Sequence, residues 1–157
     1  MHIAHFPSHL DQNITTQQTK NLRIGIVQAR FNYEITSTLK NSCEQELITW
    51  GVKPKNIIDI TVAGALELPF ALQTLAQTDT FDVLIAIGCV IRGDTYHFEI
   101  VCDQSGAGIM NVSLKYDVPI INCVLTVNTM EQAIERQVIK GQEGAKTALE
   151  MALLDQI

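Results

Sequence analysis

A turn between an apolar run and an expected helix is the part of the sequence best suited to chemistry. Gly93-Asp94-Thr95 follows a run that ends at Ile91, and helical spacing begins at His97. Glycine in such a turn lets backbone N–H groups face an anion, and the helix N-terminus adds partial positive charge. Thr95 can donate its hydroxyl. Many turns of this composition serve only as turn and cap, so a phosphate site is one of two interpretations.

His97 and Arg136 are the candidates for moving protons and for holding negative charge. An imidazole exchanges protons near neutral pH; its alternative role is that of a hydrogen-bonded structural histidine, and the adjacent turn favours function. A guanidinium can bind phosphate through two hydrogen bonds. The local pattern alone favours a solvated Arg136 paired with Glu135 or Gln132. The Asp94 carboxylate would repel a phosphate unless its side chain points away or caps the helix.

Phe31 and Glu67 follow two other apolar runs. An aromatic side chain at the end of a strand could stack on a flat ring, although core packing is the commoner role of a phenylalanine. A carboxylate after Gly64 could accept hydrogen bonds from a polyol, and its alternative role is that of a first-turn acid that stabilises a helix N-terminus.

Cysteine and histidine usage argues against a thiol or metal centre. Cys89 and Cys123 lie in apolar runs and are expected to be core residues; the alternative, a catalytic thiol, lacks an electropositive neighbourhood. The cysteines show no CxxC spacing, which predicts reduced thiols in a cytosol. Three histidines have a spacing that hints at metal but no acidic or cysteine partner nearby, so we expect no metal site: His2, His5 and His9.

The elements that position these residues are visible as four apolar, β-branched runs separated by helical patterns. The runs are nearly continuous, which is typical of strands buried on both faces of a parallel sheet. They are Leu22–Gln28, Ile57–Val62, Asp82–Ile91 and Val118–Val127.

Helical spacing fills the intervals. The first helix is expected to have Asn32 as N-cap and to stop at Gly51; the last begins with a Thr129–Gln132 capping box and is expected to be interrupted near Gly141 and Gly144. Two further helices are expected over Leu68–Gln77 and His97–Tyr116.

Alternating strands and helices predict an α/β three-layer sandwich, with a four-stranded parallel sheet flanked by helices. The carboxyl ends of parallel strands share one edge, where ligands bind. We expect residues 22–157 to form a single domain and residues 1–21 a flexible arm. Gly106 and Gly108 in the third helix permit close helix approach, which would serve self-association or ordinary packing.

Bulk properties exclude several classes of protein. The chain has 157 residues, of which 46% are hydrophobic, enough for a core. Its net charge of −6, without a basic cluster, argues against a nucleic-acid partner. No apolar run is long enough to cross a membrane, and the first 21 residues do not resemble a secretory signal, so a cytoplasmic location is expected.

Four motifs together resemble the 6,7-dimethyl-8-ribityllumazine synthase family. They are ARFN, GALELP, GCVIRGDTYHFEIV and MEQAIER, in the family's order between about residues 22 and 154. The resemblance implies a flavodoxin-like strand order and a transferase of riboflavin biosynthesis. Such an enzyme condenses 5-amino-6-(D-ribitylamino)uracil with 3,4-dihydroxy-2-butanone 4-phosphate, without a metal or organic cofactor. Riboflavin synthase, which uses the product, becomes a candidate partner.

The resemblance also implies roles for individual residues. Phe31 would stack on the pyrimidine, His97 would transfer protons, and Asp94 and Thr95 would hold the phosphate, with Gly93 as a further candidate. The ribityl pocket would consist of Ala65, Leu66 and Glu67, and the uracil would meet backbone groups of Cys89, Val90 and Ile91. Asn122 and Arg136, with assistance from Lys140, would come from an adjacent subunit.

Three departures from the family pattern qualify these expectations. Ala63 replaces the usual proline, and Asn122 stands where many members have an aromatic side chain. The chain is also shorter between Arg136 and Gly141. That region helps to decide between pentamers, decamers and sixty-subunit shells, so the pentamer alone is expected. Two rival interpretations stay open: a flavin- or lumazine-binding relative without turnover, and a flavodoxin-like regulator, which would be monomeric.

Overall fold

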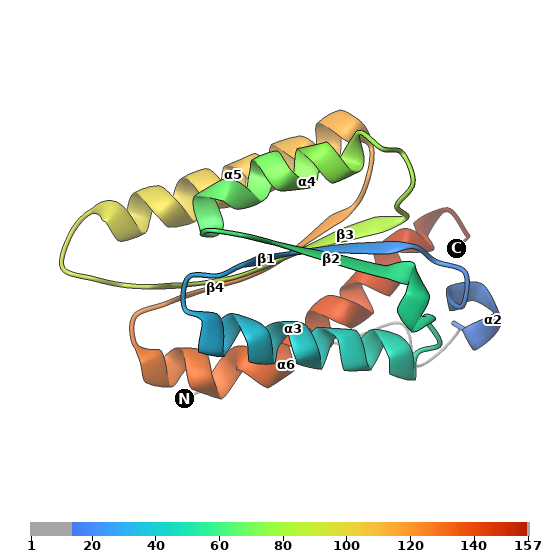
Figure 1. The fold of residues 1–157 in the computed structure, drawn as a ribbon, viewed down its shortest axis with the longest axis horizontal. Helices are drawn as coiled ribbons and strands as arrows, with labels where there is room; N and C mark the ends of the chain where they lie inside the picture. The colour runs from blue at the N-terminus through green and yellow to red at the C-terminus, as the bar shows by residue number, and fades with distance from the viewer. Residues whose placement is uncertain (1–13, 157) are drawn as a thin grey trace.

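The computed structural model describes residues 14–156 as one sheet between two layers of helices (Figure 1). The strands are β1 (Ile24–Ala29), β2 (Ile57–Val62), β3 (Val83–Ile91) and β4 (Ile120–Val127). The main helices are α3 (Tyr33–Thr49), α4 (Leu68–Ala76), α5 (His97–Tyr116) and α6 (Met130–Ala152). Short helices are α2 (Thr16–Thr19), η1 (Pro54–Asn56), η2 (Ala65–Glu67) and η3 (Leu154–Gln156).

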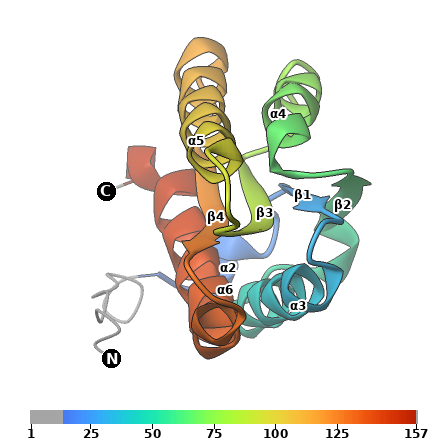
Figure 2. The same ribbon diagram turned by 90° about the vertical axis from the view of Figure 1, so that its left-hand side faces the viewer.

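All strands are parallel, in the order β2-β1-β3-β4. Figure 2 shows α4 and α5 on one face of the sheet and α3 and α6 on the other. Each face has its own core: Leu39, Leu47 and Leu149 belong to the α3/α6 side, and Leu68 and Ile109 to the α4/α5 side. The predicted α/β three-layer sandwich is therefore confirmed.

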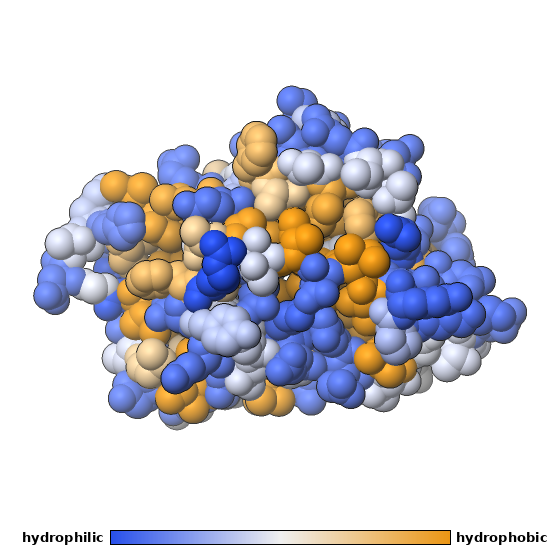
Figure 3. Space-filling model, in the orientation of Figure 1, coloured by the Kyte–Doolittle hydropathy of each residue, from blue (hydrophilic) through white to orange (hydrophobic). Residues whose placement is uncertain are grey.

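Burial follows the position of each strand in the sheet. Every residue of β1 is buried, as are the first seven of β3, which is the predicted pattern of a strand covered on both faces. The prediction is wrong for β2, whose residues are half-buried or exposed, and it holds for only four of the eight residues of β4, the strand at the other sheet edge. β2 pairs only with β1 and lies at the sheet edge, so neighbours cover it less. Figure 3 shows this side of the molecule, where apolar side chains lie among polar ones.

Helix α6 is continuous, which corrects the predicted interruption near Gly141 and Gly144. Both glycines are buried because α6 crosses close to other elements there. A Cβ at Gly141 would overlap Ser42 and the backbone of Leu39, and a Cβ at Gly144 would overlap the Cys123 thiol. Tertiary packing therefore offsets the weak helix propensity of glycine.

The predicted caps are confirmed in part. Gly51 ends α3 in the left-handed region, with φ of 103°. Thr129 caps α6 by accepting a hydrogen bond from the Gln132 amide at 3.2 Å, whereas the Gln132 side chain accepts from Asn128 instead of completing a capping box. Asn32 precedes α3 at φ of 59°, and its side chain does not cap the helix.

Residues 1–13, which hold most of the predicted arm and its three histidines, lie outside the described residues. The last part of the arm packs on the domain: Thr19 of α2 is buried and donates a hydrogen bond to the carbonyl of Trp50. Within residues 14–156, no helix is both long and apolar enough to cross a membrane.

Candidate functional site

A pocket of about 520 Å³ opens at the edge where β1, β2 and β3 end. Parallel strands bring the loops that follow them to one edge, so residues far apart in sequence line the same cavity. The lining consists of Ala29, Phe31, Ala63, Gly64, Ala65, Leu66, Glu67, Cys89, Val90, Ile91, Gly93, Thr95, His97, Phe98 and Val101.

The turn after β1 presents an aromatic ring to this pocket. Backbone N–H groups of Arg30 and Phe31 donate to the carbonyls of Val62 and Ala63 at 2.8 and 3.0 Å, continuing the β1–β2 ladder. The Phe31 side chain is 71% exposed, so it is not a core residue. Asn32, in its left-handed conformation, donates from Nδ2 to the Cys89 carbonyl at 2.8 Å and thereby ties this turn to β3.

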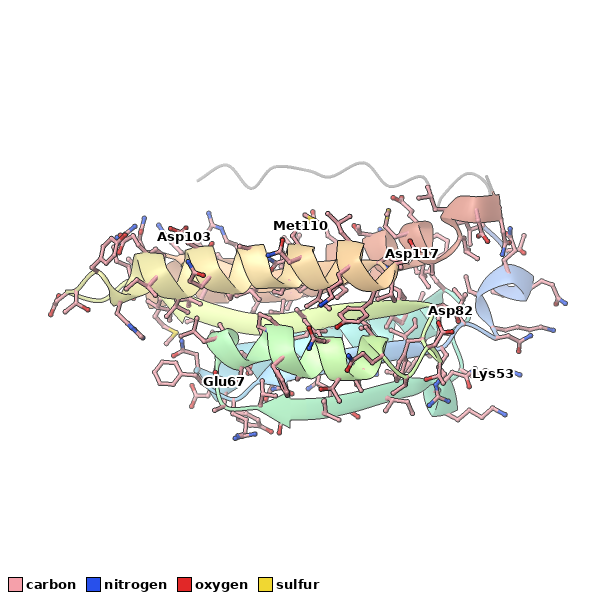
Figure 4. The ribbon with its side chains drawn as sticks, turned by 90° about the horizontal axis from the view of Figure 1, so that it is seen from above. Lys53, Glu67, Asp82, Asp103, Met110 and Asp117 are labelled. Carbon is pink, nitrogen blue, oxygen red and sulfur yellow. The ribbon has the colours of Figure 1, made fainter. Side chains whose placement is uncertain are left out.

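The turn after β2 supplies a carboxylate. Glu67 is exposed at the start of α4, and its Oε2 lies 3.3 Å from where a Cβ on Gly64 would be. A side chain at Gly64 would therefore crowd the carboxylate. Figure 4 places Glu67 at the end of the molecule where the strands finish, opposite Lys53 and Asp82. Ala65 is buried beside it and Leu66 is exposed.

The end of β3 contributes a wall that is apolar and uncharged. Cys89 is buried, and burial raises the pKa of its thiol to about 11. At neutral pH the thiol is therefore protonated, which argues against a nucleophilic cysteine. Val90 and Ile91 are half-buried and line the pocket beyond it.

The predicted anion turn, Gly93-Asp94-Thr95, is exposed and borders the pocket. The pocket lining includes Gly93, Thr95 and the adjacent His97, and a Cβ at Gly93 would meet no atom within 4 Å. The His97 amide donates to Thr95 Oγ1 at 3.4 Å. Within residues 14–156, the His97 imidazole has no hydrogen-bond partner, so the structural-histidine role finds no support. Asp94 shares the turn but does not line the pocket.

Besides Asp94, three residues expected at the site do not line this pocket within one chain. Asn122 on β4 accepts a hydrogen bond from the Val124 amide at 2.9 Å, and Arg136 on α6 donates to the Gln132 carbonyl at 3.0 Å and to Glu135 at 3.5 Å. Lys140 is half-buried on α6. The pocket lining consequently holds no lysine or arginine among the described residues.

The comparisons with known proteins identify the family of the chain. The family model described as 6,7-dimethyl-8-ribityllumazine synthase matches residues 21–156. The chain belongs to that family. The match covers all four strands and the main helices, and therefore every element that lines the pocket.

Relatives named 6,7-dimethyl-8-ribityllumazine synthase match over most of their length. The Paracidovorax citrulli protein is 54% identical over 135 residues, which is 86% of this chain and 88% of the relative. The Verminephrobacter eiseniae protein is 53% identical over 137 residues, covering 87% and 89%. The Burkholderia mallei protein is 53% identical over 133 residues, covering 85% and 77%.

Sequence reasoning missed part of this lumazine synthase family pocket. Phe98 and Val101 line it from the first turns of α5, although the sequence analysis gave them only a place in the helix expected over His97–Tyr116. Ala29, Ala63 and Gly64 line it through the ends of β1 and β2. Their position at the end of β1 and just after β2 was the available signal. Within the described residues, no group of three histidine, cysteine, aspartate or glutamate side chains could hold a metal ion.

Proposed function

We propose that this protein condenses 5-amino-6-(D-ribitylamino)uracil with 3,4-dihydroxy-2-butanone 4-phosphate to form 6,7-dimethyl-8-ribityllumazine, releasing phosphate and water. The observation that carries the proposal is one pocket that combines an exposed aromatic ring, a carboxylate, an anion turn and a histidine. Membership of the lumazine synthase family supports it.

The first substrate is assigned to the Phe31 side of the pocket. The Phe31 ring stacks on the pyrimidine, since stacking removes its exposed apolar face from water. Glu67 accepts hydrogen bonds from ribityl hydroxyls, next to Ala65 and Leu66. Backbone groups of Cys89, Val90 and Ile91 contact the uracil edge.

The second substrate is assigned to the turn before α5. Thr95 and backbone N–H groups near Gly93 and Asp94 receive the phosphate at the helix N-terminus. The amine of the uracil attacks the ketone and loses water to give an imine, phosphate is eliminated, and the ribitylamino nitrogen closes the second ring with loss of a second water. Alignment of two reactive substrates can supply about 7–11 kcal/mol, and His97 moves the protons.

The missing positive charge is assigned to a neighbouring copy of the chain. A phosphate held only by N–H groups and a hydroxyl lacks a cation, and no lysine or arginine of residues 14–156 lines the pocket. We assign Arg136 to this role, assisted by Lys140, with Asn122 completing the wall across the interface. Exposed apolar side chains on α5 and α6 support self-association, including Met110, Leu114 and Ile134. The proposed assembly is built on a homopentamer.

The cell compartment and a protein partner complete the proposal. All four cysteines are free thiols in the structure, which favours the cytosol. Riboflavin synthase, which would consume the product, is the proposed partner.

The reaction is tested by mixing pure protein with both substrates and recording the absorbance of the lumazine. The expected result is product formation with release of an equal amount of phosphate. Binding of the lumazine without turnover would overturn the proposal in favour of a non-catalytic binding relative.

Sharing of the site is tested by co-expressing two impaired variants, His97→Ala and Arg136→Ala, so that they assemble into mixed particles. In a closed ring with head-to-tail interfaces, about one site in four combines an intact His97 with a neighbour's intact Arg136. Activity is therefore expected to return in mixed particles. If the mixture stays as inactive as either variant alone, Arg136 does not act across the interface.

A further inference from the structure

Arg92 is the residue of the anion-turn region with the most contacts, and no role in the reaction has been assigned to it. It follows β3 directly, and its backbone N–H donates to the Val127 carbonyl at 2.9 Å, which extends the β3–β4 ladder by one step. Its guanidinium donates from Nε to Asn128 Oδ1 at 2.8 Å and forms an ion pair with Glu99. The same group stacks over the Phe98 ring, 4.3 Å from its centroid.

These contacts close the base of the turn. Residues 93–96 connect Arg92, just after the end of β3, to the first turn of α5, which contains Phe98 and Glu99. The guanidinium therefore bridges the two ends of the segment that carries Thr95, and the ring that it covers is itself part of the pocket lining. Outside this bridge, the turn is exposed and has few other contacts that fix its position.

The charge of Arg92 is already compensated. Its hydrogen bond to Glu99 lowers the pKa of that carboxyl, so the acid is ionised at neutral pH. The Arg92 guanidinium is paired with a carboxylate and stacked on a ring, so we do not assign it as a ligand of the phosphate. Exposed ion pairs contribute little to global stability. The contacts of Arg92 are therefore expected to fix the position of the turn rather than to stabilise the whole fold.

The contacts also reach the helix that carries Arg136. Asn128 accepts from Arg92, and its own backbone N–H donates to Gln132 Oε1 at 2.7 Å. The Gln132 carbonyl in turn accepts from Arg136 Nη1 at 3.0 Å. The start of α6 is thereby connected to the anion turn through two side chains.

We propose that Arg92 is a positioning residue that fixes the anion turn and the start of α6 relative to each other, so that Thr95 and Arg136 are both held in place for the phosphate. The inference rests on the proposed function, because the two ends of this connection would serve the phosphate subsites of adjacent copies. Arg92 itself does not touch the substrate.

The kinetic test compares Arg92→Gln with Arg92→Lys. Arg92→Gln loses the ion pair and the fork of hydrogen bonds, and is expected to raise KM for the butanone phosphate about tenfold, the scale of a modest misplacement of a binding group. KM for the uracil substrate should stay nearly unchanged. Arg92→Lys keeps the charge opposite Glu99 but not the Nε donor, so partial rescue is expected. Equal effects on both substrates, or none, would overturn the proposal.

The matched control is Arg23→Gln. Arg23 is another exposed arginine stacked on an aromatic ring, 5.1 Å from the centroid of Phe81, but it precedes β1 at the opposite end of the sheet. This variant should leave both KM values unchanged. A rise in KM as large as that of Arg92→Gln would mean that loss of any such surface arginine has the effect, and would overturn the positioning role.

A second readout does not depend on turnover. Hydrogen–deuterium exchange at the amides of residues 93–96 should be faster in Arg92→Gln than in the wild type or Arg23→Gln, and inorganic phosphate should slow it in the wild type more than in the variant. If exchange at residues 93–96 is the same in Arg92→Gln as in the wild type, Arg92 does not position the turn. Absence of lumazine formation by the wild type would instead count against the proposed function, and the exchange result would still decide the role of Arg92.

Discussion

Burial distinguishes the Cys89 thiol from the His97 imidazole, two side chains that line the same pocket. Cys89 faces the cavity with its thiol protonated, because burial raises its pKa to about 11. His97 borders the same cavity from an exposed turn, without a partner for its ring among the described residues. The imidazole therefore has access to both solvent and pocket, and it is the side chain to which the proposed function assigns proton transfer.

Replacement of His97 by alanine tests that assignment. We expect kcat to fall about 10²-fold, because general acid–base catalysis contributes at least that much, while KM for both substrates changes little. Steady-state kinetics with each substrate varied in turn gives both constants. Tyr96→Phe, at the neighbouring exposed position, is the control and should behave as the wild type. A full-speed His97→Ala enzyme would remove the proton-transfer role.

Burial of the Cys123 thiol is expected to make the unfolding free energy of the protein depend on pH above about 9. Burial raises the pKa of its thiol from 9.0 to about 11, a change that the Lys140 charge only partly opposes. The folded state holds this proton more tightly than the unfolded state does. The stabilisation is therefore complete below pH 9 and is lost as the pH rises toward 11.

We expect the wild type to lose about 2 kcal/mol more unfolding free energy than Cys123→Ala between these two pH values. Urea denaturation at each pH measures the difference. Cys102→Ala, which removes a half-exposed thiol, should keep most of the wild-type loss. Parallel pH profiles for the wild type and Cys123→Ala would contradict the assignment.

At the scale of elements, small residues decide how closely the helices pack. Gly141 lets α6 approach α3, and the Ser42 hydroxyl donates across this contact to the Val138 carbonyl at 2.6 Å. Gly108 similarly lets α5 approach Pro69 at the start of α4, which is ordinary packing between helices. Gly106 has open space around it.

Two alanine substitutions should therefore have opposite effects. Gly141→Ala is expected to destabilise the fold by about 1–3 kcal/mol, since the added methyl overlaps the Leu39 carbonyl and must displace a helix. Gly106→Ala meets no atom within 4 Å and should stabilise α5 by about 0.5–1 kcal/mol through helix propensity. Urea denaturation at fixed protein concentration measures both. If both variants lose the same unfolding free energy, the close contact at Gly141 and the open space at Gly106 do not control the effect of the added methyl group.

At the scale of the whole molecule, the chain leaves apolar side chains uncovered on α5, which lines the pocket, and on α6. Met110 and Leu114 on α5 are 60% and 75% exposed, and Met130, Ile134 and Val138 form a further stripe on α6. Contiguous exposed apolar side chains of this kind mark interfaces. A second copy that covers them could also bring a cation to the pocket, which one chain does not supply among its described residues.

The mass of the particle in solution tests this arrangement. Light scattering should give five times the 17.4 kDa of the chain, or a multiple of that pentamer. The double variant Met110→Lys/Leu114→Lys should give smaller particles and lose activity, because buried unpaired charges disfavour the interface. Ile48→Lys, on the exposed side of α3, is the matched control and should keep the wild-type mass. A monomeric wild type would contradict the shared site.

The sequence by itself determined the order of elements and which residues meet at the carboxyl edge of the sheet. The ranges predicted for β2 and α5 agree with the structure, because apolar periodicity and strand ends are local properties of the chain. The parallel order then brings Phe31, Glu67 and His97 to one pocket.

Only the tertiary structure decided the features that depend on distant partners. β2 is only partly covered because it lies at an edge, and α6 passes uninterrupted through two glycines because α3 and β4 lie close to it. Asn32 is the N-cap residue of α3 as predicted, but its side chain binds the Cys89 carbonyl instead of the helix. Arg92 meets Asn128 across 36 positions of sequence. Such contacts join strands and turns that are adjacent only in the folded sheet, and no local pattern encodes them.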